Sequence, residues 1–310
     1  MENFSNHPLY RRHNLDSAMS SLWDFYRGKF VILFISSLVM SLIMQVISST
    51  IDLSEMTYMT DPYEILNKIK SFIWPIIIVS LLNLFFTVIL GHYIIYNPLD
   101  SDTTIFVSSY KSLKYFIPYL IILILFAFLG SFALIIGLFA LIIGIFFVAL
   151  YMVTLFLFFL PVLLVEGTNI GNAISRSFRL AHKGFWSNIG WTAVLILIVL
   201  VISLILSMII MIPFSGSFFK VLADPAEAAN VTSFITNPLY IILGALANAI
   251  VFPLLPIFGT ILYFNGRAKE EKGTEAETGA TPVTDGDDQG EVKVEDLDTK
   301  PLPEENNEKE

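Results

Sequence analysis

The chain of 310 residues contains no cysteine. This absence excludes disulfides, thiolate metal sites and cysteine nucleophiles, and it leaves the redox compartment undetermined. Charge is equally scarce inside the long apolar runs, which hold no Asp, Glu, Lys or Arg. An ion- or proton-coupled transporter usually needs at least one such residue within the membrane. The sequence also shows no Gly-rich phosphate loop, metal-spaced His/Asp cluster or Ser–His–Asp arrangement, so we expect no cofactor.

What the sequence has in abundance is apolar residues: it is 55% hydrophobic, with a mean hydropathy of +0.72. Several runs exceed the roughly 18 apolar residues that indicate a membrane span. We therefore predict an all-α membrane protein with a membrane domain over 14–266, after a polar leader over 1–13. Its six transmembrane helices are expected at about 30–51, 72–96, 116–138, 142–165, 189–214 and 239–264.

The third and fourth spans come from one uninterrupted apolar block, Phe116–Val165. As a single helix this block would be about 75 Å long, against a hydrocarbon core of about 30 Å. It must therefore fold back on itself, and we place the turn within 136–144. Glycines recur every seven residues there, at Gly130, Gly137 and Gly144. Close helix packing is the commoner use of such glycines, and hinges are the alternative.

The net charge of −9 belongs to the C-terminal segment. Residues 267–310 carry fifteen acidic and six basic residues, and the remaining residues carry twelve of each sign. A segment so rich in charge and so poor in large apolar residues cannot bury enough surface to fold. We predict a disordered acidic cytoplasmic tail over 267–310, whose role the sequence does not reveal.

Basic residues are distributed unequally between the two sides of this six-span arrangement. Up to Lys272, twelve fall on the side of both termini, and only Lys68, Lys70 and Lys220 fall on the other. Because basic residues are retained on the cytoplasmic side, both termini are expected in the cytoplasm. We expect the protein in the cell (inner) membrane.

An amphipathic segment precedes three of the spans. The apolar positions are Leu15, Met19, Leu22, Trp23 and Tyr26 after a predicted N-cap at Asn14; Phe106, Tyr110 and Leu113 within 102–114; and Ile170, Ile174, Phe178, Ala181 and Phe185. Aligned on Ser21, Ser109 and Ser177, each segment shows an aromatic near the serine, then basic residues, then aromatics. We predict three repeats, each an interfacial amphipathic helix followed by a transmembrane hairpin.

Two motifs carry a resemblance. The segment over 161–186 reads PVLLVEGTNIGNAISRSFRLAHKGFW, and the last span ends in Tyr263-Phe264-Asn265-Gly266-Arg267. Both are similar to the glycerophosphoryl diester phosphodiesterase membrane-domain family and related bacterial six-span membrane proteins. The resemblance implies a bundle of six spans and no activity of its own, since the phosphodiesterase chemistry of the named enzymes lies in a separate soluble domain. Asn265 and Gly266 depart from the family's pattern, in which acidic residues often follow the tyrosine.

The candidate site residues lie in the first of these motifs: Glu166, Arg176, Ser177, Arg179 and Lys183. Glu166 can bind a cation, pair with Arg176 or Arg179 or relay protons, or it can simply suit the dipole of the following helix. The basic residues can bind anionic lipid headgroups, or they can serve only the orientation of the chain. In the spans, Asn83, Asn248 and a helix break at Pro253 and Pro256 are the features that a solute pathway would use.

We therefore expect an integral membrane protein, non-enzymatic, that acts through lipid or protein contacts of its cytoplasmic amphipathic helices. Its expected partners are membrane lipids and a membrane or cytoplasmic protein, with no nucleic acid. The alternative is a transporter or channel for an uncharged or lipid-like solute. The ligand, the partner's identity and the oligomeric state do not follow from the sequence.

Overall fold

The protein is a multi-pass, all-α membrane protein. A computed structural model describes residues 4–51, 59–139, 141–216 and 237–278, in which every regular element is a helix. Six of the helical segments in this part of the chain are long and apolar enough to cross a membrane. The helices are η1 (Phe4–Asn6), α1 (Leu15–Gly28), α2 (Phe30–Ser48), α3 (Pro62–Tyr96), α4 (Ile105–Phe139), α5 (Leu141–Glu166), α6 (Ile170–Lys183), α7 (Phe185–Met211), η3 (Ile212–Phe214), α10 (Pro238–Val251) and α11 (Leu254–Thr278).

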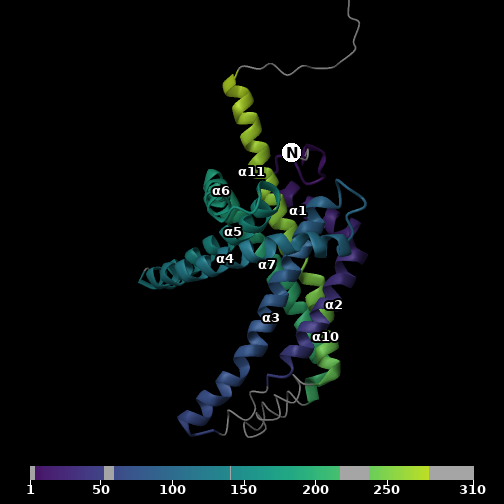
Figure 1. Cartoon of the computed structure of the whole chain (residues 1–310), viewed down its shortest axis with the longest axis vertical. Helices are drawn as coiled ribbons and strands as arrows, with labels where there is room; N and C mark the ends of the chain where they lie inside the picture. The colour runs from purple at the N-terminus through teal and green to yellow at the C-terminus, as the bar shows by residue number, and fades with distance from the viewer. Residues whose placement is uncertain (1–3, 52–58, 140, 217–236, 279–310) are drawn as a thin grey trace, which may run out of the picture.

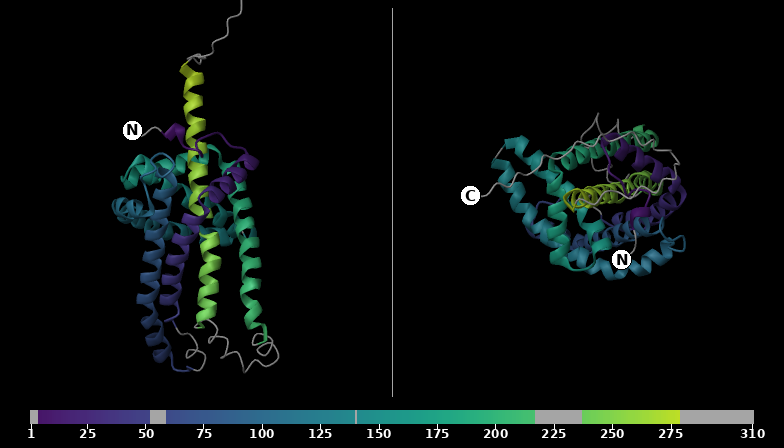
Figure 2. Two further views of the ribbon diagram at one scale, coloured as in Figure 1. Left: turned by 90° about the vertical axis from the view of Figure 1, so that its right-hand side faces the viewer. Right: turned by 90° about the horizontal axis from the view of Figure 1, so that it is seen from above.

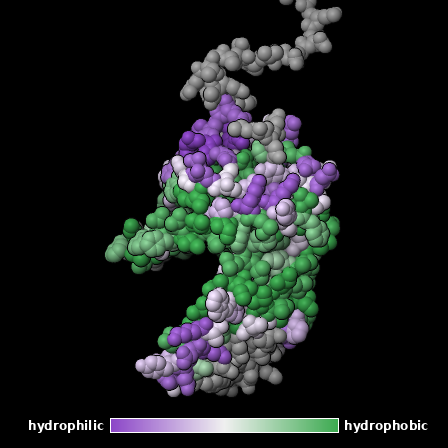
Figure 3. All heavy atoms as spheres, viewed as in Figure 1, coloured by the Kyte–Doolittle hydropathy of each residue, from purple (hydrophilic) through white to green (hydrophobic). Residues whose placement is uncertain are grey.

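Four helices, α2, α3, α7 and α10, run side by side away from one end of the molecule (Figures 1 and 2). The N-terminal segment, α1, α6 and the last turns of α11 gather at that end, which we call the polar end. Figure 3 shows hydrophilic residues there and an apolar belt below it. The described parts nearest to both termini therefore lie on the same side of the belt.

The α4–α5 hairpin departs from this arrangement. It lies crosswise beneath the polar end and projects sideways, away from α3, as Figure 1 shows. Figure 3 shows the surface hollowed between the hairpin and the lower body. The six long apolar helices therefore do not all run parallel to one another. The projecting part of the hairpin exposes large apolar side chains such as Phe139 and Phe146, and lipid chains are as apolar as leucine, so this part can face lipid.

The hairpin itself is closed by the predicted glycines. A Cβ at Gly130 would overlap Met152 of α5, and one at Gly137 would lie 3.2 Å from the carbonyl oxygen of Gly144. Helix α4 ends at Phe139 and α5 begins at Leu141, within the predicted turn region. The predicted packing role of these glycines is thus confirmed.

The helices that precede the spans differ from the prediction in their register. Asn14 caps α1 as predicted, and Asn169 caps α6 in the same way, each accepting a hydrogen bond from the backbone N–H three residues on. Aligned on these caps and on Thr104, the buried positions coincide: Ala18, Ser108 and Ala173, then Leu22, Ser112 and Ser177. The alignment on Ser21, Ser109 and Ser177 therefore differs from this register by one to three residues.

The apolar residues predicted to share one face of 102–114 point away from the protein. Phe106, Tyr110 and Leu113 are 87%, 79% and 54% exposed, whereas Ser108 and Ser112 are buried. Small residues face the bundle because they allow close approach, while the large ones are left to the lipid interface. In α6 the buried face is likewise shifted by one residue, to Ala173, Ser177, Leu180 and Ala181.

Two boundaries also differ. The segment over 102–114 does not form a separate helix, because α4 is continuous from Ile105. The last span is broken as predicted, between Val251 and Leu254, and it then continues as helix to Thr278, twelve residues into the predicted tail. The rest of that tail lies outside the described residues.

Candidate functional site: an arginine-lined cavity at the polar end

A cavity of about 740 Å³ opens at the polar end, where α3, α5, α6 and α11 meet. Three guanidinium groups and one carboxylate line it, from Arg176, Arg179, Arg267 and Glu166. Apolar and aromatic side chains form the remaining wall, notably Phe4, Tyr96, Tyr115 and Leu164. The lining therefore carries an excess of positive charge above an apolar floor.

One wall of the cavity is a cluster of ion pairs around Arg176. Its Nε donates to both carboxylate oxygens of Glu166, at 2.9 and 3.0 Å. Its two terminal nitrogens donate to the two oxygens of Glu270 on α11, one of them at 3.0 Å. The Tyr263 hydroxyl also donates to Glu166, at 3.0 Å. A planar guanidinium suits this double fork, which ties α6 to the end of α5 and to α11.

These contacts balance the positive charge of Arg176. Burial by itself would lower the pKa of the guanidinium, but the hydrogen bonds to Glu270 and Glu166 outweigh it and raise the pKa. Arg176 is therefore permanently cationic and is already neutralised by two carboxylates. Removal of both carboxylates would leave a partly buried charge without a partner.

Arg179 and Arg267 have different surroundings. Arg267 lies 3.6 Å from Glu271, one turn further along α11. Arg179 is exposed, and it has no hydrogen bond or ion pair with any residue that the structure describes. Of the three arginines in the lining, Arg179 is thus the one whose guanidinium is available to a ligand.

A second, neighbouring cavity extends the basic surface. It shares Tyr96 and Tyr115 with the arginine cavity and is lined by Lys111, Lys114 and Asp100. The Lys114 ammonium lies 4.7 Å from the centre of the Tyr115 ring, in a cation–π contact. The two lysines come from the start of α4, so two of the three basic segments seen in the sequence meet at this place.

The structure separates the five residues predicted for the site. Glu166, Arg176 and Arg179 lie together at the cavity. Ser177 is fully buried, and its hydroxyl donates to the Ala173 carbonyl inside α6, so it faces the bundle. Lys183 is exposed at the end of α6, outside the described lining, where a cation suits the helix dipole.

Several residues of this site were missed from the sequence. Glu270 and Arg267 had been assigned to the tail, and Tyr96 and Tyr115 to the ends of spans. A signal was present for α11, because Tyr263, Arg267 and Glu270 are spaced four and three residues apart and fall on one helix face. The pairing of Glu270 with Arg176, 94 residues away in the chain, carries no such signal.

No metal centre is apparent, since the described residues contain no group of three His, Cys, Asp or Glu side chains that could hold an ion. Comparisons with known proteins add no assignment: no protein-family model, curated protein or solved structure matches the chain.

Proposed function

We propose that this membrane protein binds anionic membrane lipids at the arginine-lined cavity, without catalysing a reaction. The observation that carries the proposal is the guanidinium of Arg179, which lines the cavity and pairs with none of the residues that the structure describes. Basic residues at the membrane surface attract anionic headgroups by about 1 kcal/mol each. The cavity adds a defined place for such a group, which a scattered basic surface lacks.

This proposal places the polar end in the cytoplasm and the protein in a cell (inner) membrane. Support comes from the gathering of the basic segments at one end and from the anionic lipids of cytoplasmic leaflets. The exposed aromatic face of Phe106 and Tyr110 supports an interfacial position for the first turns of α4. Membership of the glycerophosphoryl diester phosphodiesterase membrane-domain family stays a prediction.

The test compares two substitutions on α6. The protein is purified in a neutral detergent and titrated with fluorescent phosphatidylglycerol, with phosphatidylcholine as the uncharged competitor. Arg179→Gln is expected to weaken phosphatidylglycerol binding about fivefold, the equivalent of about 1 kcal/mol for one basic residue. Lys183→Gln, which removes the same charge one turn away and outside the lining, is expected to leave affinity within a factor of two.

Equal losses in the two variants would mean that the lipid responds only to the general basic surface, and the site would be rejected. No loss in either would reject lipid binding by charge at this face. In that case a protein partner of the same face, which the sequence also allows, becomes the hypothesis to pursue by cross-linking in native membranes.

A second candidate function, transport of an uncharged or lipid-like solute, is favoured by one observation. Asn83 and the broken last span, which lie far apart in the sequence, line one pocket inside the membrane region. Asn248, the other polar residue considered for such a pathway, is exposed and outside that lining. Solute or lipid movement across proteoliposomes containing the protein is the discriminating measurement, and absence of movement for a broad lipid and metabolite panel argues against it.

A further inference from the structure

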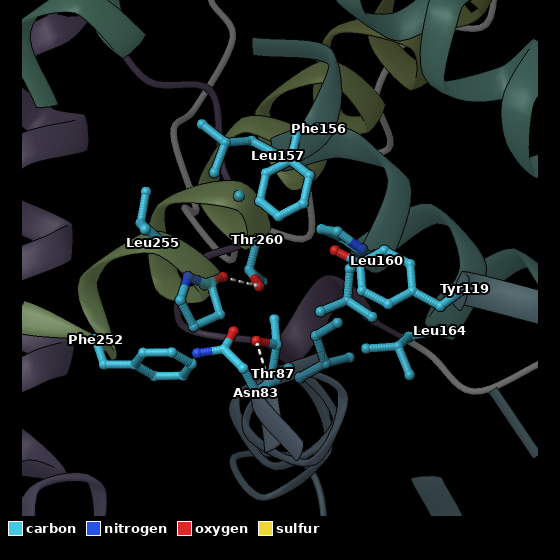
Figure 4. A pocket seen from close by; sticks show the side chains of 15 residues that line it. Asn83, Thr87, Tyr119, Phe156, Leu157, Leu160, Leu164, Phe252, Leu255 and Thr260 are labelled. Atoms are coloured by element: carbon cyan, nitrogen blue, oxygen red, sulfur yellow. Dashed lines mark hydrogen bonds between the residues drawn. The ribbon is translucent and has the colours of Figure 1, made fainter. Parts of the chain in front are cut away.

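An apolar pocket of about 110 Å³ lies on the membrane side of the arginine cavity, among α3, α4, α5 and α11 (Figure 4). Most of its wall is hydrocarbon, including Leu157, Leu160, Leu255 and Phe252. The polar side chains in the wall are largely occupied. The Thr87 and Thr260 hydroxyls each donate to a carbonyl of their own helix, at 2.8 Å, and these bonds are drawn in Figure 4. The pocket therefore offers an apolar ligand a largely apolar surface.

The helices around the pocket pack through glycines, and one of them is interrupted beside it. A Cβ at Gly259 would lie 2.6 Å from the carbonyl oxygen of Leu157, and one at Gly91 would lie 2.7 Å from the Leu160 side chain. The backbones of α5 and α11 thus approach closely at Gly259, whereas Gly91 of α3 makes room for the Leu160 side chain of α5. The interruption between α10 and α11 lies at the same place, and Phe252, Leu255 and Pro256 around it line the pocket.

The pocket and the arginine cavity share a wall. Leu164 lines both of them, and Ile95 in the pocket precedes Tyr96 in the cavity. The Tyr96 hydroxyl donates to the Leu164 carbonyl at 2.8 Å, near the end of α5, where carbonyls lack partners within the helix. A ligand that occupies both spaces has to pass this hydrogen bond.

We propose that the two spaces form one binding site for a single anionic lipid. The phosphate of the headgroup lies against Arg179, and a segment of one acyl chain passes Tyr96 and occupies the apolar pocket. The volume sets the length of that segment, since a dry cavity of about 150 Å³ accommodates a benzene molecule. The pocket therefore takes part of one chain, and the remaining lipid lies in the hollow beside α3. This inference rests on the proposed function and adds the position of the chain.

The test uses phosphatidylglycerol that carries a photoreactive diazirine in one acyl chain, incorporated in nanodiscs with the full-length protein. We expect cross-links on the pocket faces of α3 and α5, within 83–95 and 156–164. Thr87→Phe fills the pocket and is expected to reduce these cross-links at least fivefold. Ser80→Phe makes the same change in size on an exposed position of α3 and is expected to leave them unchanged.

The outcomes separate this inference from the proposed function. If the chain cross-links spread evenly over the exposed faces of α2 and α7 and Thr87→Phe has no effect, the inference is wrong, although headgroup binding that depends on Arg179 would still stand. If Thr87→Phe removes the cross-links but Arg179→Gln leaves affinity unchanged, the proposed function fails, and with it the headgroup part of this inference.

Two further measurements keep the test decisive. Should Thr87→Phe fail to fold, Asn83→Leu replaces a polar lining residue with a bulkier apolar one and is expected to give a smaller, measurable change in cross-linking. Inorganic phosphate alone, at millimolar concentration, is expected to leave the chain cross-links in place. Complete displacement by phosphate would show a site for the free anion and would overturn the lipid assignment.

Discussion

Arg176 carries a charge that holds helices together, in contrast to the nearby Arg179, whose charge is available for binding. The Arg176 guanidinium is held by Glu166 on one edge and Glu270 on the other, and Tyr263 adds a third contact to Glu166. Such a residue fixes the relative positions of three helices, and each of its three nitrogens already donates to a carboxylate. Arg179 lies three residues further on the same helix without such partners. Two arginines that look equivalent in the sequence therefore have different roles.

His7 carries a prediction about pH. Its Nδ1 accepts a hydrogen bond from the Leu9 N–H at 3.1 Å, and its Nε2 lies 3.1 Å from the Ile94 carbonyl oxygen, to which it donates. These partners require the neutral ring, because a second proton would point at the Leu9 N–H. Burial lowers the pKa of His7 from 6.5 to about 4, despite the bond to Ile94. Since the folded pKa is below the unfolded value, stability is complete above pH 6.5 and is lost as the pH falls to about 4.

The expected loss is up to about 3 kcal/mol of unfolding free energy. The measurement is the thermal unfolding midpoint in detergent between pH 7.5 and 4. His7→Gln keeps a donor and an acceptor but cannot be protonated, so its midpoint should fall less over this range than that of the parent protein. Burial also lowers the pKa of His13, which acts in the same direction and remains in the variant. Identical pH profiles for the two proteins would contradict the assignment to His7.

At the scale of single elements, helices α1 and α6 show which features the repeated units have in common. Helices α1 and α6 are each 14 residues long, begin after an asparagine cap, and end at one non-helical residue, Lys29 or Gly184. A phenylalanine then opens the following span in both cases. In the second unit the chain passes the equivalent point, Tyr119, without leaving the helix. The side-chain pattern is thus shared by all three units, while the hinge is present in only two.

The contact between α5 and α11 leads to a prediction about packing. Gly259 meets the backbone of α5, so a methyl group there must push the two helices apart. Overpacking of this kind costs about 1–3 kcal/mol. We therefore expect Gly259→Ala to lower the thermal unfolding midpoint and to weaken lipid binding in the pocket beside it.

Gly190→Ala is the matched control, because nothing lies within 4 Å of the Cβ at that position of α7. Alanine is the better helix former by up to about 1 kcal/mol, so this variant should be as stable as the parent or slightly more stable. A Gly259→Ala protein with an unchanged midpoint would show that α5 and α11 are not in close contact in the membrane.

The sequence was sufficient for the elements and insufficient for their arrangement, for a physical reason. The six long apolar segments, the Asn14 cap and the break near Pro253 all depend on residues close together in the chain. The direction of the α4–α5 hairpin and the contact of Glu270 depend on distant segments. Apolar surfaces in a membrane pack against lipid and protein with similar energy, so hydropathy carries no information about which helices become neighbours.

For the whole molecule, the crosswise hairpin has a consequence for membrane placement. The hairpin leaves the polar end and ends in exposed phenylalanines and leucines, with Phe139 85% exposed at its tip. If α2, α3, α7 and α10 cross the bilayer, the hairpin lies within one leaflet. Its tip is then surrounded by lipid chains and does not reach the water on the opposite side of the bilayer. The hollow next to α3 faces the bilayer at the depth where an acyl chain would leave the apolar pocket.

Because the chain contains no cysteine, single cysteines can test this arrangement directly. Three positions suffice: Lys183→Cys at the polar end, Tyr63→Cys at the opposite end of α3, and Phe139→Cys at the hairpin tip. A membrane-impermeant maleimide applied to sealed, oriented vesicles should label the first from the cytoplasmic side and the second from the other side. The third should be labelled from neither side and should react only with a lipid-soluble maleimide. Labelling of Phe139→Cys from the same side as Tyr63→Cys would show that the hairpin crosses the membrane, and the sideways arrangement would have to be abandoned.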